Sequence, residues 1–122
     1  MSESKSQVVV RPILNAVEAW DNSSLGSYLP GVVQLSILHV SVPPSGSSDW
    51  HTNPTPVAVY VMAGSLNIEV EGTDIKKVVK AGNAFAEIRD LVNRHGTAGP
   101  EGAELIVFFA GSPGVSLMGP PV

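Results

Sequence analysis

One short stretch and two further histidines carry most of the chemistry that this sequence offers. In DWHTNPTPV, His51 stands two residues before Asn53. Residues two apart in a β-strand point to the same side, so both side chains would face one way. Two imidazoles at this spacing would indicate a metal chelate, but here the second group is an amide. The stretch is therefore a metal site, the remnant of one, or the entrance of a strand.

The other candidate groups lie further along the chain. His95 stands in the loop-like stretch RDLVNRHGTAG, before the last long apolar run. His39 shares its alternation with Leu35 and Ile37, so it faces the interior if they do. We interpret it as a histidine of the core or wall. Glu87 is either a general base in a cavity or one half of a solvated or internally paired couple with Arg89.

The elements that position these groups are short and β-rich. Glycine and proline are spread along the chain, with 12 and 10 residues, and they separate runs rich in β-branched residues. Such punctuated runs are typical of an all-β sandwich or barrel. Glu71 to Asp74 would connect a hairpin. The only helical signal is one short segment, Ile13–Trp20. The runs are Val8–Val10, Val32–Val42, Val57–Met62, Leu66–Val70, Ile75–Val79 and Leu105–Phe109.

Composition narrows the class of protein. The 122 residues suit one domain, and 43% hydrophobic against 15% charged residues is typical of a globular chain. A net charge of −4 argues against nucleic acid or an anionic membrane as a partner. The absence of cysteine excludes disulfides and zinc–thiolate sites. Without an apolar signal segment or a run long enough to span a bilayer, we expect a cytoplasmic protein.

The order of these pieces resembles the cupin superfamily of small double-stranded β-helix barrels, over about Val33 to Gly111. The family's first motif has two histidines two apart, then a glutamate and a glycine. His51 matches the first histidine and Gly64 the glycine, while Asn53 and Val57 replace the second histidine and the glutamate. Gly82 matches the start of the second motif. His95 matches its histidine, two residues later than the family spacing, with Asn93 in register.

The resemblance implies an antiparallel, all-β jelly-roll barrel of the cupin type with little helix. We divide the single domain into an N-terminal arm with a short helix or strand, a barrel core and a C-terminal arm, at 1–32, 33–111 and 112–122. It also implies a cavity for a small molecule, in which His51, Asn53 and His95 converge. Asn53 and Tyr60 would contact the ligand, and Tyr60 would lie at the mouth or at an interface. The strand alternation adds Val57, Val59 and Val61 as an apolar cavity wall.

Two functions follow from the resemblance, and they differ in what the altered ligand set does. The family set suits Zn, Ni, Mn or Fe, whereas His51, His95 and Asn53 would hold a divalent metal weakly or not at all. The first function is an enzyme of the isomerase, lyase or cyclase type, with His51, His95 and Glu87 as acid–base groups. The alternative is a ligand-binding, sensor or accessory module without turnover. In either case exposed strand edges predict a homodimer.

Overall fold

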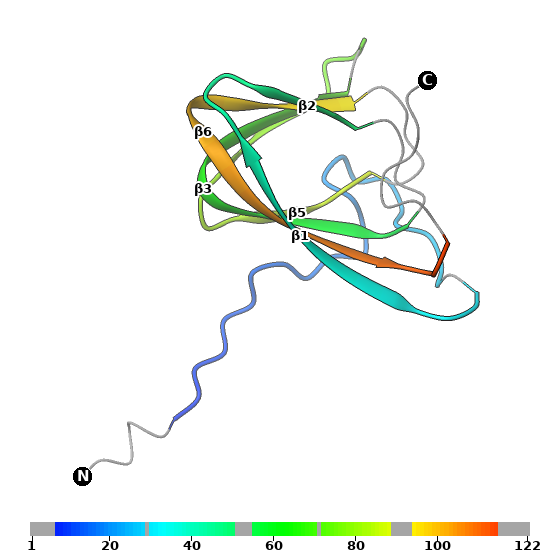
Figure 1. The fold of residues 1–122 in the computed structure, drawn as a ribbon. Coiled ribbons are helices and arrows are strands. Elements are labelled where there is room, and N and C mark those ends of the chain that lie inside the picture. The colour runs from blue at the N-terminus through cyan, green and yellow to red at the C-terminus, as the bar shows by residue number, and fades with distance from the viewer. Residues whose placement is uncertain (1–6, 29, 51–54, 71, 89–93, 115–122) are drawn as a thin grey trace.

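The computed structural model describes residues 7–28, 30–50, 55–70, 72–88 and 94–114, with residues 48–50, 94 and 95 described by their backbone alone. All strands of this part belong to one antiparallel sheet that curves back over itself (Figure 1). The long strands β6 and β3 lie at its centre, and β1 and β4 flank them in the order β1-β6-β3-β4. β2 pairs with β6, and β5 with β3. The strands are β1 (Gln34–Val42), β2 (Ser47–Trp50), β3 (Val57–Val70), β4 (Lys76–Lys80), β5 (Ala84–Ala86) and β6 (Arg94–Gly111).

The sheet closes on an apolar interior because side chains alternate along its two long strands. In β6, Leu105, Val107 and Phe109 are at most 1% exposed, while the residues between them are half-buried. They pair with the equally buried first half of β3. The second half of β3 adds Leu66 and Ile68, and β4 adds Val79, to the same core. The predicted all-β barrel is therefore confirmed.

Two glycines allow β3 and β6 to bend together. Gly64 and Gly102 have φ of +76° and +82°, a region that residues with a β-carbon avoid. The register between β3 and β6 shifts on either side of Ala63 and Gly64. A β-carbon on Gly64 would run into the backbone carbonyl of Gly102. The bend thus depends on two backbones that approach each other without side chains.

The hairpin prediction is confirmed. Val70 and Ile75 close the turn between β3 and β4 with a 3.0 Å hydrogen bond, from the Val70 N–H to the Ile75 carbonyl. The Thr73 hydroxyl also donates to the Val70 carbonyl at 2.9 Å. Glu69 and Lys76 are the last paired residues before the turn.

The predicted helix over Ile13–Trp20 is wrong. The segment has no helical residue; instead, Glu18 forms an isolated antiparallel bridge with Ser24. The Trp20 N–H donates to the Ala86 carbonyl at 2.9 Å, and Ala19 is buried against Val70 and Ile88. A segment this short is a marginal helix on its own, so these tertiary contacts decide its conformation. Val8–Val10 forms no strand either.

The prediction of a loop around His95 also needs correction. His95 lies in β6, where its backbone pairs with Asp49 of β2 and Glu69 of β3. Glycine and proline are frequent here, but two neighbouring strands satisfy the backbone of this stretch.

No helix in the described part is long and apolar enough to cross a membrane.

Candidate functional site

The predicted valine wall faces the inside of the barrel. Val57, Val59 and Val61 are 4%, 1% and 0% exposed, and they pair with the buried residues of β6. Val57 also lines a pocket of about 270 Å³ at this end of the sheet. These side chains belong to the apolar core and carry no polar group.

Glu87 is a buried carboxyl group beside this wall. It follows β5, and its N–H donates to the Val57 carbonyl at 2.9 Å. Glu87 shares the alternation of Phe85, which faces the core, and is itself only 3% exposed. This burial rules out a solvated side chain and leaves the other sequence interpretations, a general base in a cavity or an internally paired carboxylate. A buried carboxyl group next to apolar side chains is a typical acid–base candidate.

Thr55 is a polar residue that the sequence interpretation missed. It is 1% exposed, and its hydroxyl has no hydrogen-bond partner among the described residues. Thr55 lies two residues before Val57, so the alternation that selected the valines also included it. Its methyl side packs against Gly111, where an added β-carbon would come within 2.9 Å of Thr55 Cγ2. A buried hydroxyl without a partner costs free energy, so it calls for an explanation.

Tyr60 lies on the other side of the sheet. It alternates with Val59 and Val61, is half-buried, and pairs with Ala84 of β5 and Ile106 of β6. The structure thus separates Tyr60 from the inward-facing valines with which the sequence grouped it.

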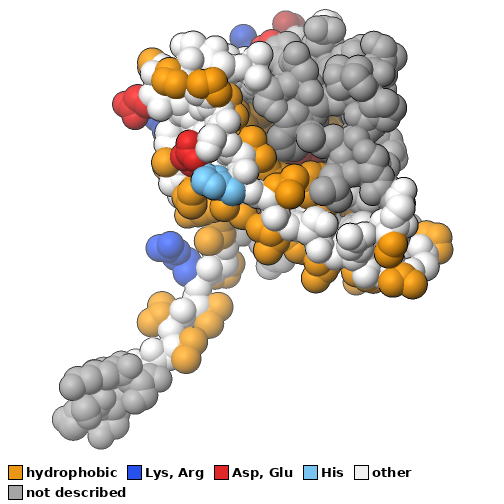
Figure 2. Space-filling model, viewed as in Figure 1, with side chains coloured by type: hydrophobic (Ala, Val, Ile, Leu, Met, Phe, Trp, Pro, Cys, Tyr) orange, Lys and Arg blue, Asp and Glu red, His pale blue; other side chains and the backbone are white. Residues whose placement is uncertain are grey.

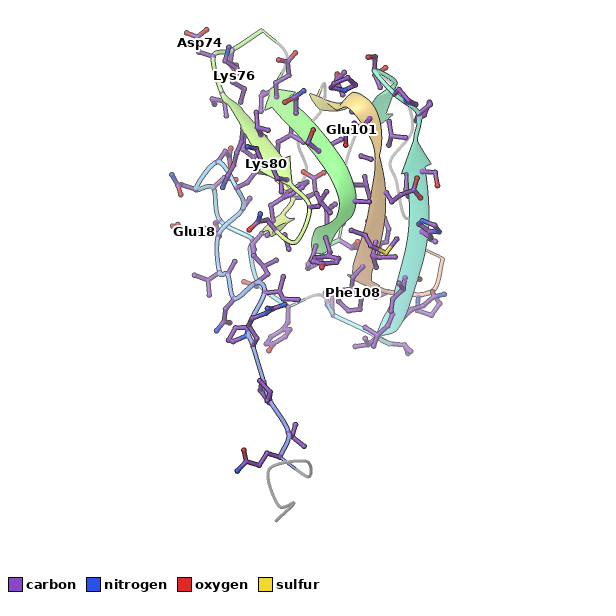
Figure 3. All side chains as sticks on the ribbon, turned by 90° about the vertical axis from the view of Figure 1, so that its left-hand side faces the viewer. Glu18, Asp74, Lys76, Lys80, Glu101 and Phe108 are labelled. Atoms are coloured by element: carbon purple, nitrogen blue, oxygen red, sulfur yellow. The ribbon has the colours of Figure 1, made fainter. Side chains whose placement is uncertain are left out.

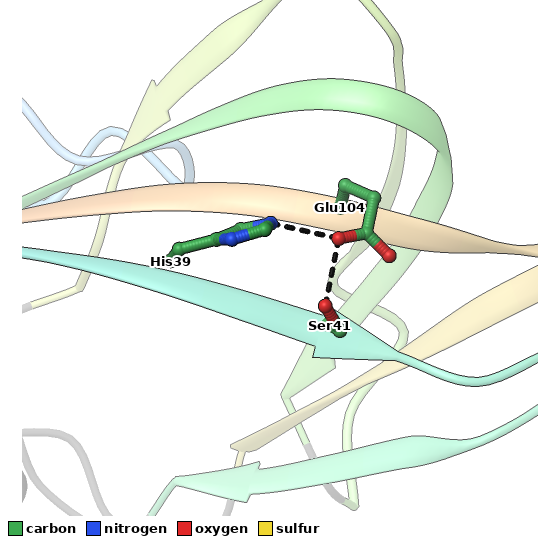
Figure 4. A network of polar contacts seen from close by, with 3 residues as sticks. All are labelled: His39, Ser41 and Glu104. Atoms are coloured by element: carbon green, nitrogen blue, oxygen red, sulfur yellow. Dashed lines mark hydrogen bonds and ion pairs between the residues drawn. The ribbon is translucent and has the colours of Figure 1, made fainter.

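His39 is an exposed residue, contrary to its interpretation as a core or wall histidine. Leu35, Ile37 and His39 all point outward, because Leu38, Val40 and Val42 are the residues of β1 that face the core. The His39 side chain is 55% exposed, and its Nε2 lies 2.7 Å from Glu104 Oε1 (Figure 4). The three residues share one face of β1, as their alternation predicts, but this face points to solvent and not to the core.

Ser41 completes this outer network. Its hydroxyl donates to the same Glu104 Oε1 at 2.7 Å. The hydrogen bonds from Ser41 and then from His39 lower the pKa of the Glu104 carboxyl from its ordinary value of 4.5. The Ser41 hydroxyl and the His39 imidazole both bind the Glu104 carboxylate. Because the Ser41 hydroxyl donates its hydrogen to Glu104 and not to His39, the network is not a nucleophile–base pair.

The proposed metal ligands lie mostly outside the described residues. This holds for His51, for Asn53 and for the side chain of His95. At the position of the family's glutamate, Val57 is an aliphatic residue buried in the core and cannot bind a metal. No group of three or more His, Asp or Glu side chains in the described part is placed to hold a metal ion. We therefore derive no chemical step through a metal.

A groove lies between the N-terminal segment and the end of the sheet. It has a volume of about 620 Å³, and Tyr28, Val33, Pro56, Ala110 and Gly111 contribute to its lining. The smaller pocket beside Val57 shares Pro56 and Ala110 with it. The buried side chain of Thr55 thus lies next to a groove residue, Gly111, with its methyl group nearer to that residue than its hydroxyl.

Comparison with known proteins supports the barrel fold. No family model and no curated protein matches the sequence. Among solved structures, an RmlC-like cupin from Shewanella frigidimarina superposes with a TM-score of 0.54 and 22% identity, covering 66% of this chain and 68% of that one. An oxalate oxidase in complex with the substrate analogue glycolate gives 0.55 and 26%, covering 68% and 45%.

A third similar structure is a DMSP lyase from Ruegeria pomeroyi, with a TM-score of 0.55 and 17% identity. It covers 67% of this chain and 41% of the lyase. The matched region is less than half of the oxidase and of the lyase. These likenesses share one barrel architecture and differ in the chemistry that their names state.

Proposed function

We propose that this chain, a member of the cupin superfamily by its fold, binds a small and partly apolar molecule at the end of its barrel. The observation that carries the proposal is the burial of two polar residues at Val57: Thr55 lies two residues before it, and the Glu87 N–H donates to its carbonyl. Small-molecule sites combine such an apolar wall with a few placed polar groups. The glycolate held by the similar oxalate oxidase supports small hydroxy acids as the first ligands to test.

In this proposal each residue has a stated role. Thr55 donates or accepts a hydrogen bond at a ligand oxygen, and Val57 and Val59 contact its apolar part. Glu87 exchanges a proton with the ligand, and His51 and His95 are the further acid–base groups, with Asn53 as an amide contact. The reaction would be an isomerisation, elimination or cyclisation, which needs proton transfer and no redox cofactor.

A second candidate is a binding module without turnover. The specific observation that favours it is Val57, an aliphatic residue where the family has a carboxylate. Such a module would keep the two buried polar residues for recognition alone. Glu87→Gln separates the two: a module keeps its ligand affinity or changes it moderately, whereas an enzyme keeps binding and loses product formation.

The test is a thermal-shift screen with glycolate, other small hydroxy acids and small amides. We expect at least one compound to raise the melting temperature of the parent and of Thr55→Ser, but to lose its effect on Thr55→Val. Without ligand, Thr55→Val should be as stable as the parent or more stable, because it removes a buried hydroxyl that lacks a partner in the described part. A strongly destabilised Thr55→Val would instead assign the hydroxyl to the fold.

Elemental analysis of protein purified without added metal accompanies the screen. It measures whether a divalent metal, of the Zn, Ni, Mn or Fe type, copurifies with the chain. Our proposal predicts metal well below one equivalent per chain, because Val57 supplies no ligand.

A further inference from the structure

The groove and the smaller pocket adjoin each other on the outer face of the sheet. Ala58, Phe108 and Ala110 alternate along their strands with the core residues, so their side chains face outward. Figure 3 shows Phe108 at the end of β6 that lies near the N-terminal segment. The sheet therefore lies between this space and the apolar core. The residues that line both the groove and the smaller pocket are Ala16, Leu25, Pro56 and Ala110.

Small side chains leave the space open on the side of the sheet. Ala58 pairs with Ala86 of β5 and with Phe108 of β6, and both alanines line the smaller pocket. The Ala110 N–H donates to the Pro56 carbonyl at 3.1 Å. Three neighbouring strands thus present alanine where larger side chains would fill the gap to the N-terminal segment.

The opposite wall is fixed by backbone hydrogen bonds. It includes Val17 and Leu25, the two ends of the loop over residues 17–25. The Leu25 N–H donates to the Val17 carbonyl at 3.4 Å, and the Trp20 N–H joins the loop to the Ala86 carbonyl at 2.9 Å. Leu25 also packs against a buried apolar cluster. The loop is therefore held at the sheet without filling the space below it, so the groove exists before a ligand binds.

The lining indicates the chemistry of an occupant. None of the described residues that line the groove or the smaller pocket is charged. Burying an ion against such a lining is unfavourable. Tyr28 in the groove and Phe108 in the pocket supply aromatic rings, which stack on other rings. Tyr28 and Ser112 also supply hydroxyl groups. This combination suits a neutral, mainly apolar ring with a polar substituent.

The rim of the groove is exposed and apolar. Val17 and Val33 are 85% and 70% exposed, and Tyr28 is fully exposed. Apolar side chains gather along β1, the strand that Val33 precedes (Figure 2). Exposed apolar surface of this kind marks a ligand groove or a protein contact. Two facing walls and a volume of about 620 Å³ favour a small molecule, since pockets for such ligands have this size.

We propose that the groove is a second binding site, which takes a neutral aromatic molecule that carries a hydroxyl group. The ring lies between Leu25 and the alanines of the sheet, and its hydroxyl group hydrogen-bonds at Tyr28 or Ser112. This site is on the outer face of the sheet. It is separate from the inward-facing site of the proposed function, and the two differ in ligand class, because small hydroxy acids are anions.

Isothermal titration at pH 7 with 1-naphthol, which is neutral, and 1-naphthoate, its anionic counterpart, tests the ligand class. We expect 1-naphthol to bind the full chain and 1-naphthoate to bind about tenfold more weakly or worse, because its charge has no partner in the lining. Failure of 1-naphthol to bind, or equal affinity for the two compounds, would overturn the proposal.

Two substitutions test the place of binding. Ala110→Leu fills the space that the groove and the pocket share, and we expect it to weaken 1-naphthol binding about tenfold or more. Its matched control is Ala84→Leu on β5, which adds the same atoms to a residue that lines neither. Tyr28→Ala changes a fully exposed residue, so it should fold normally and bind several times more weakly. Equal affinities in the parent, Ala110→Leu and Tyr28→Ala would contradict this site.

Methyl NMR separates this site from the interior of the barrel. We expect 1-naphthol to shift the methyl signals of Leu25, Val33 and Ala110 and to leave those of Val59 and Val61 unchanged. Shifts confined to Val59 and Val61 would place the compound in the barrel and refute the outer site without affecting the proposed function. If the Leu25 and Val33 signals change with protein concentration and not with 1-naphthol, a second copy of the chain covers the groove and the proposal is wrong.

Discussion

The carboxyl group of Glu104, on the outer face of the barrel, makes the stability of the fold depend on pH. The hydrogen bonds from Ser41 and His39 hold the pKa of its carboxyl below 4.5 in the folded chain. Their contribution to stability is therefore fully present above pH 4.5 and is lost as the pH falls through the lowered folded-state pKa. We expect Glu104→Gln to reduce the loss of melting temperature between about pH 6 and about pH 3. The effect should be small, because the network is exposed to solvent.

The control for this experiment is Glu101→Gln, an exposed glutamate on the same strand (Figure 3). Melting curves of the parent and both variants across the acid range give the comparison. Identical pH dependence in the parent and in Glu104→Gln would show that the hydrogen bonds do not stabilise the fold.

A substitution at Asn53 tests whether this stretch can form the metal site that the resemblance to cupins implies. If it occupies the place of the second histidine, Asn53→His restores an imidazole on the same strand face as His51. We expect the variant to bind Ni²⁺ and Zn²⁺ more tightly than the parent, because these ions favour nitrogen ligands. In isothermal titration, His51→Ala should abolish binding in both backgrounds. Equally negligible affinity in the parent and in Asn53→His would mean that His51 and His95 do not converge.

At the scale of residues, the sequence shows which side chains share one face of a strand better than it shows which face is buried. Period-two spacing correctly grouped Val57, Val59 and Val61, and it also grouped Leu35, Ile37 and His39. Nothing in β1 itself states which set faces inward, because both sets contain apolar residues; the packing of Leu38 and Val40 on the core decides it. Thr55 was overlooked because a threonine between two prolines is typical of a loop.

At the scale of elements, the bend of β3 and β6 makes the strongest prediction. Gly64→Ala must hold a β-carbon at φ +76° against the Gly102 carbonyl, whereas Gly72→Ala has φ +80° but open space around it. We expect Gly72→Ala to cost about 1–2 kcal/mol from its backbone conformation alone. Gly64→Ala should cost about 1–3 kcal/mol more, from the steric overlap. Denaturant unfolding of both variants measures the difference; equal losses would show that the close approach is unimportant.

At the scale of elements, two segments also have a local sequence pattern that differs from their structure. The runs rich in valine and leucine became the halves of β3, β4 and β6 that build the core. The first half of β6 contains GTAGPEG and appears as a loop, yet it is a strand because β2 and β3 hydrogen-bond to it. Conversely, Ile13–Trp20 has a helical pattern but is held by Ala86 and a local bridge. The local conformational preference of a segment is overridden where neighbouring elements provide hydrogen-bond partners for its backbone.

At the scale of the whole molecule, the barrel fold was predictable because a few spaced residues sufficed. His51, Gly64 and the order of the β-rich runs indicated the cupin fold, and the similar solved structures confirm it. The function was less predictable, because one architecture carries the different chemistries of those structures. The proposed function therefore depends on a ligand bound beside Val57, near the buried Thr55 and Glu87.

Methyl NMR of the labelled full chain tests this claim most directly. Glycolate, other small hydroxy acids and small amides are each added at about 10 mM, enough to detect millimolar affinity. We predict that at least one compound shifts the methyl signals of Thr55, Val57 and Val59, and leaves those of Val78 and Val8–Val10 unchanged. If every compound leaves the inward-facing methyl groups unmoved, or shifts only the valines of the arm and outer surface, the barrel end is not a small-molecule site.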